Sequence, residues 1–166
     1  IPTMREIPAD VEKKSHQLLL RAGFLRQHTS GVYSYLPFGL KVLQKIEAVI
    51  HEEMEALDVV EMRGSTLQKE ELAETFMAVE TTGAHLLQVE DRKHRQYVIG
   101  ALHKELITSL IQEEVHSYKQ LPLMLYQIVT SIQDDIRPRY GLIQSREFVK
   151  KEAYSFHHSA EDLQEK

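Results

Sequence analysis

The sequence predicts an α+β domain in which helices flank a largely antiparallel sheet. Helical and strand patterns follow one another in mixed order, without the repeated strand–helix–strand units of a parallel nucleotide-binding fold. Two β-rich runs, residues 123–132 and 147–156, are joined by a long charged loop and are predicted to pair as a hairpin. A chain of 166 residues with 42% apolar content can bury one core, so a single domain is expected.

The amino-terminal third is predicted to be mostly helical. An extended arm over residues 1–8 precedes a helix from Asp10 to about Arg21, which Gly23 is well placed to end. A short strand is expected at residues 32–36. A long helix follows, because apolar residues recur at steps of three and four, namely Leu40, Leu43, Ile46, Ile50, Met54 and Leu57.

Shorter elements are predicted for the middle of the chain. A buried strand is expected over residues 59–62 and a helix over 69–76. A hairpin of two strands, 86–90 and 95–99, and a further helix over 102–118 follow. Pro122 then interrupts the chain before the long hairpin. The sequence starts at Ile1 and stops within a helix that begins near Ser159, so we expect it to be part of something longer.

Composition narrows the function classes. With 20 Lys and Arg against 25 Asp and Glu, the net charge of −5 provides no global basic field for nucleic acid, although a local patch remains compatible with phosphate binding. The absence of cysteine excludes disulfides and thiolate metal sites. Apolar runs such as Leu18–Leu20 are far shorter than the roughly 20 residues that span a bilayer, so no membrane association is predicted.

The histidines do not predict a metal site. The run from His51 to Glu55 has Glu where a zinc-binding helix of the His-Glu-x-x-His type needs its second His. The loop of the long hairpin is the better candidate for a site, because Arg137, Arg139 and Arg146 could bind a polyphosphate or a carboxylate. From these residues alone, a solvated loop without a ligand is an equally good interpretation.

Four segments agree in order and spacing with a known pattern: SHQLLLRAGFLRQHTSGVYSYLPFGLKVLQKIEAVIHEEM, SYKQLPLMLYQI, IRPRYGL and REFVKKEAYSF. They closely resemble the amino-terminal catalytic part of the bacterial-type prolyl-tRNA synthetases, as a fragment or a degenerate paralogue. The resemblance implies a class II aminoacyl-tRNA synthetase core, ATP with Mg²⁺ as cofactor if the protein is active, a homodimer and a cytoplasmic location. Residues 1–166 would then be one partial catalytic domain, without the third signature motif and the anticodon-binding domain.

The resemblance also assigns an ATP site to the long hairpin. Its catalytic positions are Gln133, Asp135 and Arg146, and the first two depart from the Arg and Glu of the family. A preorganised charged donor at the α-phosphate is worth on the order of 3–4 kcal/mol, or about 10²–10³ in rate, so Gln133 is expected to slow adenylate formation. The other implied ATP-binding residues are Arg137, Arg139, Gln144 in place of an Arg, and Phe148, which corresponds to a ring that packs on adenine.

The implied amino-acid pocket is altered as well. Where the family has Gly-Pro-Thr-His-Glu-Glu, this chain has residues 100–105, with Leu102 at the Thr, His103 retained and Lys104 at the first Glu. The Thr and this Glu hold the imino group of proline in the family. A like-charge pair at about 4 Å costs roughly 4 kcal/mol at an effective dielectric of 20, so Lys104 opposes proline binding unless it turns away. Glu152 and Tyr154 complete the implied pocket.

These changes are concentrated in the site, while the apolar positions of the helices match the family. We therefore hypothesise a folded synthetase relative whose ligase activity is reduced or lost. Two alternatives stay open: activation of a different substrate, such as an acid whose carboxylate meets Lys104, and a non-enzymatic binding or regulatory role that uses the old dimer face. The first motif at that face has Ser65 in place of a proline. Binding of tRNA is possible but has no support from the net charge.

Overall fold

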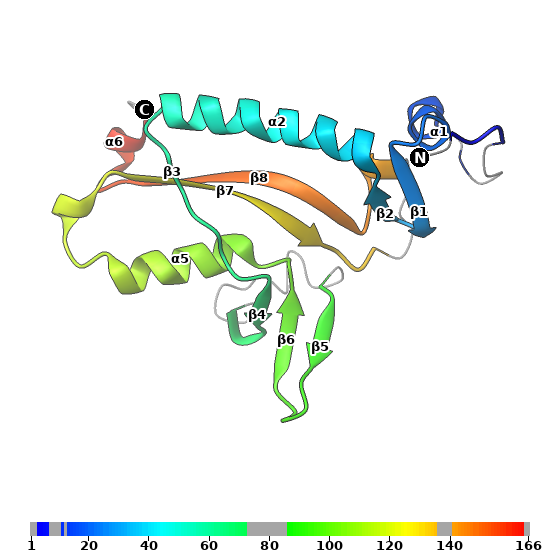
Figure 1. Ribbon diagram of the computed structural model, residues 1–166. Coiled ribbons are helices and arrows are strands. Elements are labelled where there is room, and N and C mark those ends of the chain that lie inside the picture. Colours follow the sequence, from blue (N-terminus) through cyan, green and yellow to red (C-terminus); the bar gives the residue numbers. More distant parts are fainter. Residues whose placement is uncertain (1–2, 7–10, 12, 73–85, 136–140, 165–166) are drawn as a thin grey trace.

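The computed structural model describes residues 3–6, 11, 13–72, 86–135 and 141–164, and its central feature is the long hairpin (Figure 1). Strands β7 (Leu123–Ile132) and β8 (Glu147–Phe156) pair antiparallel over their full length, from Leu123 opposite Phe156 to Ile132 opposite Glu147. Both strands have the predicted bounds. Period-two burial and the many β-branched and aromatic residues explain why this prediction is confirmed.

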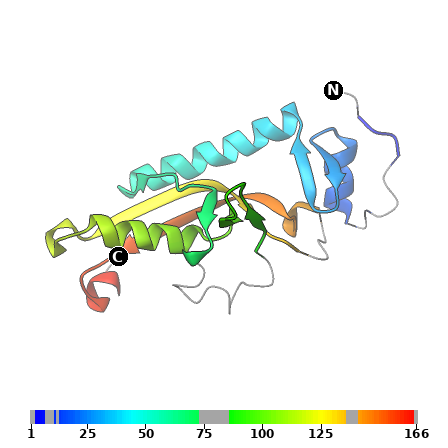
Figure 2. The ribbon, with the colours of Figure 1, turned by 90° about the horizontal axis from the view of Figure 1, so that it is seen from below.

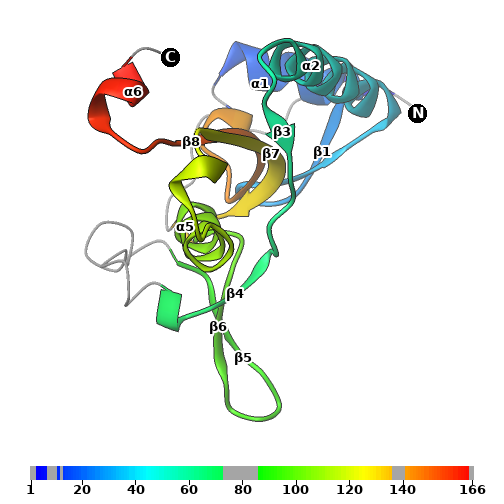
Figure 3. The ribbon, with the colours of Figure 1, turned by 90° about the vertical axis from the view of Figure 1, so that its left-hand side faces the viewer.

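The hairpin lies between two helices. Helix α2 (Pro37–Ala56) runs along one face of it and α5 (His103–Glu114) lies on the other, as Figures 1 and 3 both show. A short strand, β3 (Val60–Glu61), pairs parallel with β7 and gives the sheet order β3-β7-β8. The predicted α+β class with helices around a largely antiparallel sheet is confirmed, with the β3–β7 pair as its parallel exception.

The amino-terminal segment contains α1 (Lys14–Arg21) and a strand pair, β1 (Leu25–Thr29) with β2 (Val32–Tyr35). Strand β1 was not predicted. Pro37 begins α2, a favoured position because its missing N–H needs no partner in the first turn. The core of this segment is an apolar cluster of Val11, Leu20 and Leu25, against which Leu19, Phe24, Tyr35 and Leu142 pack.

A second small sheet, in the order β4-β6-β5, lies on the same side of the hairpin as α5 (Figure 2). Its strands are β4 (Leu67–Lys69), β5 (Gln88–Glu90) and β6 (Gln96–Ile99), all antiparallel. The predicted hairpin over residues 86–99 is confirmed. Leu86 and Val98 pack with Leu102 in an apolar cluster between this sheet and the start of α5.

Several predicted bounds need correction. The strand predicted as buried over 59–62 is shorter and consists of β3 only. Both residues of β3 are exposed, and Val59, which precedes it, is the residue that enters the core. The predicted helix at 69–76 overlaps the end of β4; residues 71–72 are helical and 73–76 lie outside the described residues. Helix α5 ends at Glu114, and a 3₁₀ turn, η2 (Tyr118–Gln120), replaces its last predicted turn. A final short helix, α6 (Ala160–Gln164), follows β8. Of the helices described, none has the length and apolar content needed to cross a membrane.

Candidate functional site

The candidate site lies on the face of the hairpin that is turned toward α5. Side chains alternate between the two faces of a strand, so Lys150, Glu152 and Tyr154 of β8 share one face. The register places Gln127 of β7 directly opposite Glu152 on that face. The neighbouring residue Tyr126 points to the other face, where its hydroxyl lies 2.7 Å from His51 Nδ1 of α2.

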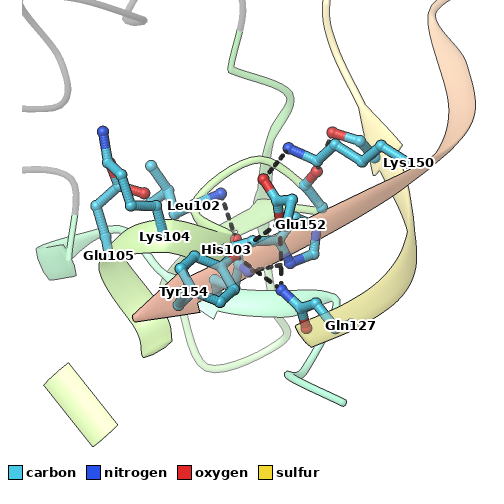
Figure 4. A network of polar contacts seen from close by, with 11 residues as sticks. Leu102, His103, Lys104, Glu105, Gln127, Lys150, Glu152 and Tyr154 are labelled. Carbon is cyan, nitrogen blue, oxygen red and sulfur yellow. Dashed lines mark hydrogen bonds and ion pairs between the residues drawn. The ribbon is translucent and has the colours of Figure 1, made fainter. Parts of the chain in front are cut away.

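A polar cluster joins the two strands, and Figure 4 shows it from close by. Gln127 is fully buried and its Nε2 donates to Glu152 Oε2 at 3.2 Å and to Tyr154 OH at 3.1 Å. The Tyr154 hydroxyl donates to the same Glu152 oxygen at 2.8 Å. Gln127 Oε1 accepts from the backbone N–H of Gly64 at 3.0 Å, which ties the segment after β3 to the cluster. All hydrogen-bonding atoms of the Gln127 side chain are thus used within the protein.

Glu152 carries a negative charge that is balanced from within the site. Lys150 Nζ lies 2.6 Å from Glu152 Oε1, and both side chains are partly buried. Burial by itself would raise the pKa of Glu152, but the hydrogen bonds from Lys150 and Tyr154 and the charge of Lys150 hold it below the ordinary value. Burial and the Glu152 carboxylate raise the pKa of the Tyr154 hydroxyl, which therefore stays a donor.

His103 lies at the start of α5 with no exposed surface. Its Nδ1 is 3.3 Å from Gln68 Nε2 of β4, and its Nε2 is buried without a hydrogen-bond partner of ordinary geometry. Gln68 also accepts from the backbone N–H of Leu102 at 2.7 Å and donates to Ser65 O at 3.1 Å. Burial lowers the pKa of His103, opposed by the nearby Glu152 carboxylate, so the ring is favoured in its neutral form.

The side chains on either side of His103 lie outside this cluster. Leu102 is buried in the apolar cluster with Leu86 and Val98. The Lys104 side chain is 76% exposed and its Nζ lies 3.5 Å from the Glu105 carboxylate. Successive helical residues point about 100° apart, so Lys104 points toward solvent when the preceding residue, His103, points into the core. Of the predicted pocket residues, the structure therefore brings His103, Glu152 and Tyr154 together and leaves the other two apart.

The predicted ATP-binding positions lie at the loop end of the hairpin. The Gln133 backbone N–H donates to Arg146 O at 2.8 Å, which extends the strand pairing by one residue pair. The Arg146 guanidinium forms an ion pair with Asp134. Gln144 is exposed, whereas Asp135 and Phe148 are partly buried. Arg137 and Arg139 lie outside the described residues.

Sequence reasoning missed three residues of the cluster. Lys150 could have been found from Glu152, because positions two apart on a strand share a face. Gln127 follows only once the hairpin register is known. Gln68 is separated by 35 positions from His103, and nothing in its own neighbourhood predicts the contact. Within the described ranges, no three His, Asp or Glu side chains are grouped as metal ligands.

Comparison with known sequences finds a family model and curated proteins that are similar to this chain. Residues 87–166 match the family described as the tRNA synthetase class II core domain (G, H, P, S and T). The proline–tRNA ligase of Bacillus subtilis is 55% identical over 165 residues, which make up 99% of this chain and 29% of that protein. That of Bacillus licheniformis is 54% identical with the same coverage. The chain thus spans less than a third of the length of these relatives.

Solved structures agree on the fold. The prolyl-tRNA synthetase of Giardia lamblia in complex with prolyl-adenylate has a TM-score of 0.80 at 22% identity and covers 87% of this chain and 30% of its own. The enzyme from Cryptosporidium parvum complexed with halofuginone and AMPPNP has a TM-score of 0.79 at 17% identity, covering 90% of this chain and 31% of its own. Both the predicted class II core and the resemblance on which it rested are confirmed.

Proposed function

We propose that this chain, a relative of the prolyl-tRNA synthetases that carries part of the class II synthetase core, has kept the fold of that core with ligase activity reduced or lost. The observation that carries the proposal is the arrangement around His103. In the resemblance, Leu102 and Lys104 occupy the positions that hold the imino group of proline. The Leu102 side chain is apolar and buried, and the Lys104 ammonium faces solvent, so neither offers an acceptor to a cationic substrate.

The nucleotide end of the site supports the same proposal. Gln133 and Gln144 carry no charge, and the Arg146 guanidinium already forms an ion pair with Asp134. An arginine that already forms an ion pair has fewer free N–H donors for a phosphate and attracts it less strongly. If any adenylation remains, we propose ATP with Mg²⁺ as its cofactor, with Arg146 at a phosphate and the Phe148 ring on adenine.

Three chimeras test the proposal against the Bacillus subtilis relative. Residues 100–105 and 133–146 of this chain are transplanted, separately and together, into the matching segments of that ligase. Loss of each charged donor at the phosphates is expected to lower proline-dependent pyrophosphate exchange by about 10²–10³. The double transplant is expected to show no measurable exchange.

A fourth chimera serves as the matched control. It carries residues 37–56, the α2 segment, which has no part in the proposed site, and should keep the exchange rate of the parent ligase. Two results would contradict the proposal: an unchanged exchange rate after both transplants, or proline-dependent exchange by this chain itself at the rate of the relative.

A second candidate function is that of a binding or regulatory protein. It is favoured by the apolar residues that α2 leaves exposed, Phe38, Leu40, Val42, Ile46 and Val49. An exposed apolar stripe of this size indicates a contact surface, and we propose that it forms a homodimer. The outward Lys104 gives no support to an acid substrate that meets this residue. Binding of tRNA and a cytoplasmic location are proposals that rest on the resemblance alone.

A further inference from the structure

The carboxylate of Glu152 is completely engaged by neighbouring side chains. Its Oε1 lies 2.6 Å from Lys150 Nζ. Its Oε2 accepts from Gln127 Nε2 and from Tyr154 OH at 3.2 and 2.8 Å. Figure 4 shows these three donors arranged around one carboxylate at the centre of the site. An ammonium group brought by a ligand would have to displace Lys150 or share its oxygen.

Lys150 belongs to the site and not to the solvated surface. It is two residues from Glu152 on the same strand, so both side chains leave the same face of β8. The Lys150 and Glu152 side chains are 29% and 21% exposed, which leaves the pair accessible to a small ligand but partly shielded from water. Partial burial strengthens the attraction between the two charges compared with a surface pair.

Glu105, the other acidic residue at this end of the site, does not replace Glu152. Its side chain is 8% exposed, and its Oε1 lies 3.5 Å from Lys104 Nζ on the solvent side. Among the described residues around His103, each carboxylate therefore has a lysine of the protein beside it.

We propose that Lys150 is a specificity-determining residue: its ammonium takes the place at Glu152 of the amino or imino group of an amino acid. The site therefore rejects α-amino acids and favours small carboxylic acids of the same shape that lack the amine. This inference rests on the proposed function, because it takes the face bearing Glu152 and Tyr154 to be the amino-acid pocket. The proposed function named only Leu102 and Lys104 as altered pocket positions. The present inference adds Lys150 as a third residue and small carboxylic acids as the class of ligand.

The experiment compares two ligands that differ only at the amine. Binding of L-proline and of cyclopentanecarboxylate is measured by calorimetry, and by ligand-observed NMR where affinity is low, for the wild-type chain and for Lys150→Met. Removing the lysine exposes one oxygen of Glu152 to the ligand cation. A charge-assisted hydrogen bond of this kind corresponds to about 10- to 100-fold in affinity.

We expect the wild-type chain to favour cyclopentanecarboxylate and Lys150→Met to favour L-proline, with the ratio of the two affinities changed by that factor. Lys151→Met is the matched control, because Lys151 is exposed on the opposite face of β8, opposite Ile128. It should keep the wild-type ratio. Lys150→Gln removes the charge but keeps a polar side chain, and it should shift the ratio in the same direction.

Three results would overturn the inference. They are an unchanged ratio in folded Lys150→Met, an equal shift in Lys151→Met, and no binding of either ligand to any of the proteins. Thermal unfolding of each variant shows that it is folded. Failure of the proposed function has a different signature, since the wild-type chain would then catalyse proline-dependent pyrophosphate exchange whatever the effect of Lys150→Met.

Discussion

Gln133 is the single residue whose replacement tests the nucleotide end of the site most directly. Its backbone is held by the hydrogen bond to Arg146 O, so a longer side chain can be introduced there without altering the strand pairing. We expect Gln133→Arg to raise the affinity for ATP by about tenfold, because an arginine adds a charge-assisted hydrogen bond to a phosphate. Isothermal titration with ATP measures the effect.

Gln164→Arg is the control for Gln133→Arg. It adds the same charge at an exposed position of α6, away from the loop, and should leave ATP binding unchanged. If Gln133→Arg binds ATP no better than the wild type, the loss of function reaches deeper than one charge, as the Arg146–Asp134 pair would explain.

His103 makes the stability of the chain depend on pH in a defined window. Burial, the main cause, lowers its pKa in the folded state below the ordinary value of about 6.5. Between the two pKa values the unfolded chain binds a proton that the folded chain does not. The free energy of unfolding therefore falls as the pH drops through about 6.5 toward the folded pKa.

Urea unfolding at about pH 7.5 and pH 5.5 measures this effect, with His103→Gln as the comparison. The variant should lose less stability than the wild type between the two values. Glu152 does not interfere, because its pKa lies below its ordinary value of 4.5, outside this window. An equal loss in both proteins would show that His103 is not the responsible group.

At the scale of elements, the long hairpin depends on one buried amide. Gln127 joins the segment after β3 to two of the β8 residues of the cluster through hydrogen bonds to Gly64, Glu152 and Tyr154. Gln127→Ala would remove the acceptor of the Gly64 N–H and one of the donors to Glu152 and to Tyr154, in a buried place. We expect it to lower the free energy of unfolding by about 2 kcal/mol in chemical denaturation.

Gln144→Ala provides the comparison for Gln127→Ala, since Gln144 is exposed in the same hairpin. A substitution at such a position usually changes stability by less than about 0.5 kcal/mol. Similar stabilities of the two variants would mean that water or a shift of the strands satisfies the partners of Gln127, and that the amide does not hold the elements together.

At the scale of the whole molecule, α2 is expected to be covered by a second copy of the chain. Val42, Ile46 and Val49 recur at helical spacing and are 46%, 53% and 57% exposed. We expect Ile46→Glu with Val49→Glu to convert a dimer into a monomer in analytical ultracentrifugation, because a carboxylate in a closed apolar interface loses its hydration.

Leu163→Glu should leave the sedimentation unchanged, because this exposed leucine lies on α6, outside the proposed surface. A stable homodimer has a dissociation constant well below roughly tens of micromolar. A wild-type chain that is still monomeric at that protein concentration would therefore contradict the homodimer. It would leave the exposed face of α2 to a different partner.

The sequence by itself determined the elements with strong periodic patterns and the family. The long helix, both strands of the hairpin and the smaller hairpin over residues 86–99 follow from local patterns, which is why the structure confirms them. The replacements at Gln133, Gln144, Leu102 and Lys104 are also visible without coordinates. Strand β1 and the exposed position of β3 were not foreseen, because both depend on how the segments pack.

Only the tertiary structure decided which charges meet. The sequence shows Lys104 as a cation in the pocket, but the start of α5 turns it to solvent, and Lys150 is the lysine that reaches Glu152. In the same way the sequence shows that Arg146 is retained, but the structure shows that its guanidinium forms an ion pair with Asp134. The physical reason is that an ion pair depends on the direction of two side chains over a few ångströms, which the strand face and the helix start set and local pattern does not.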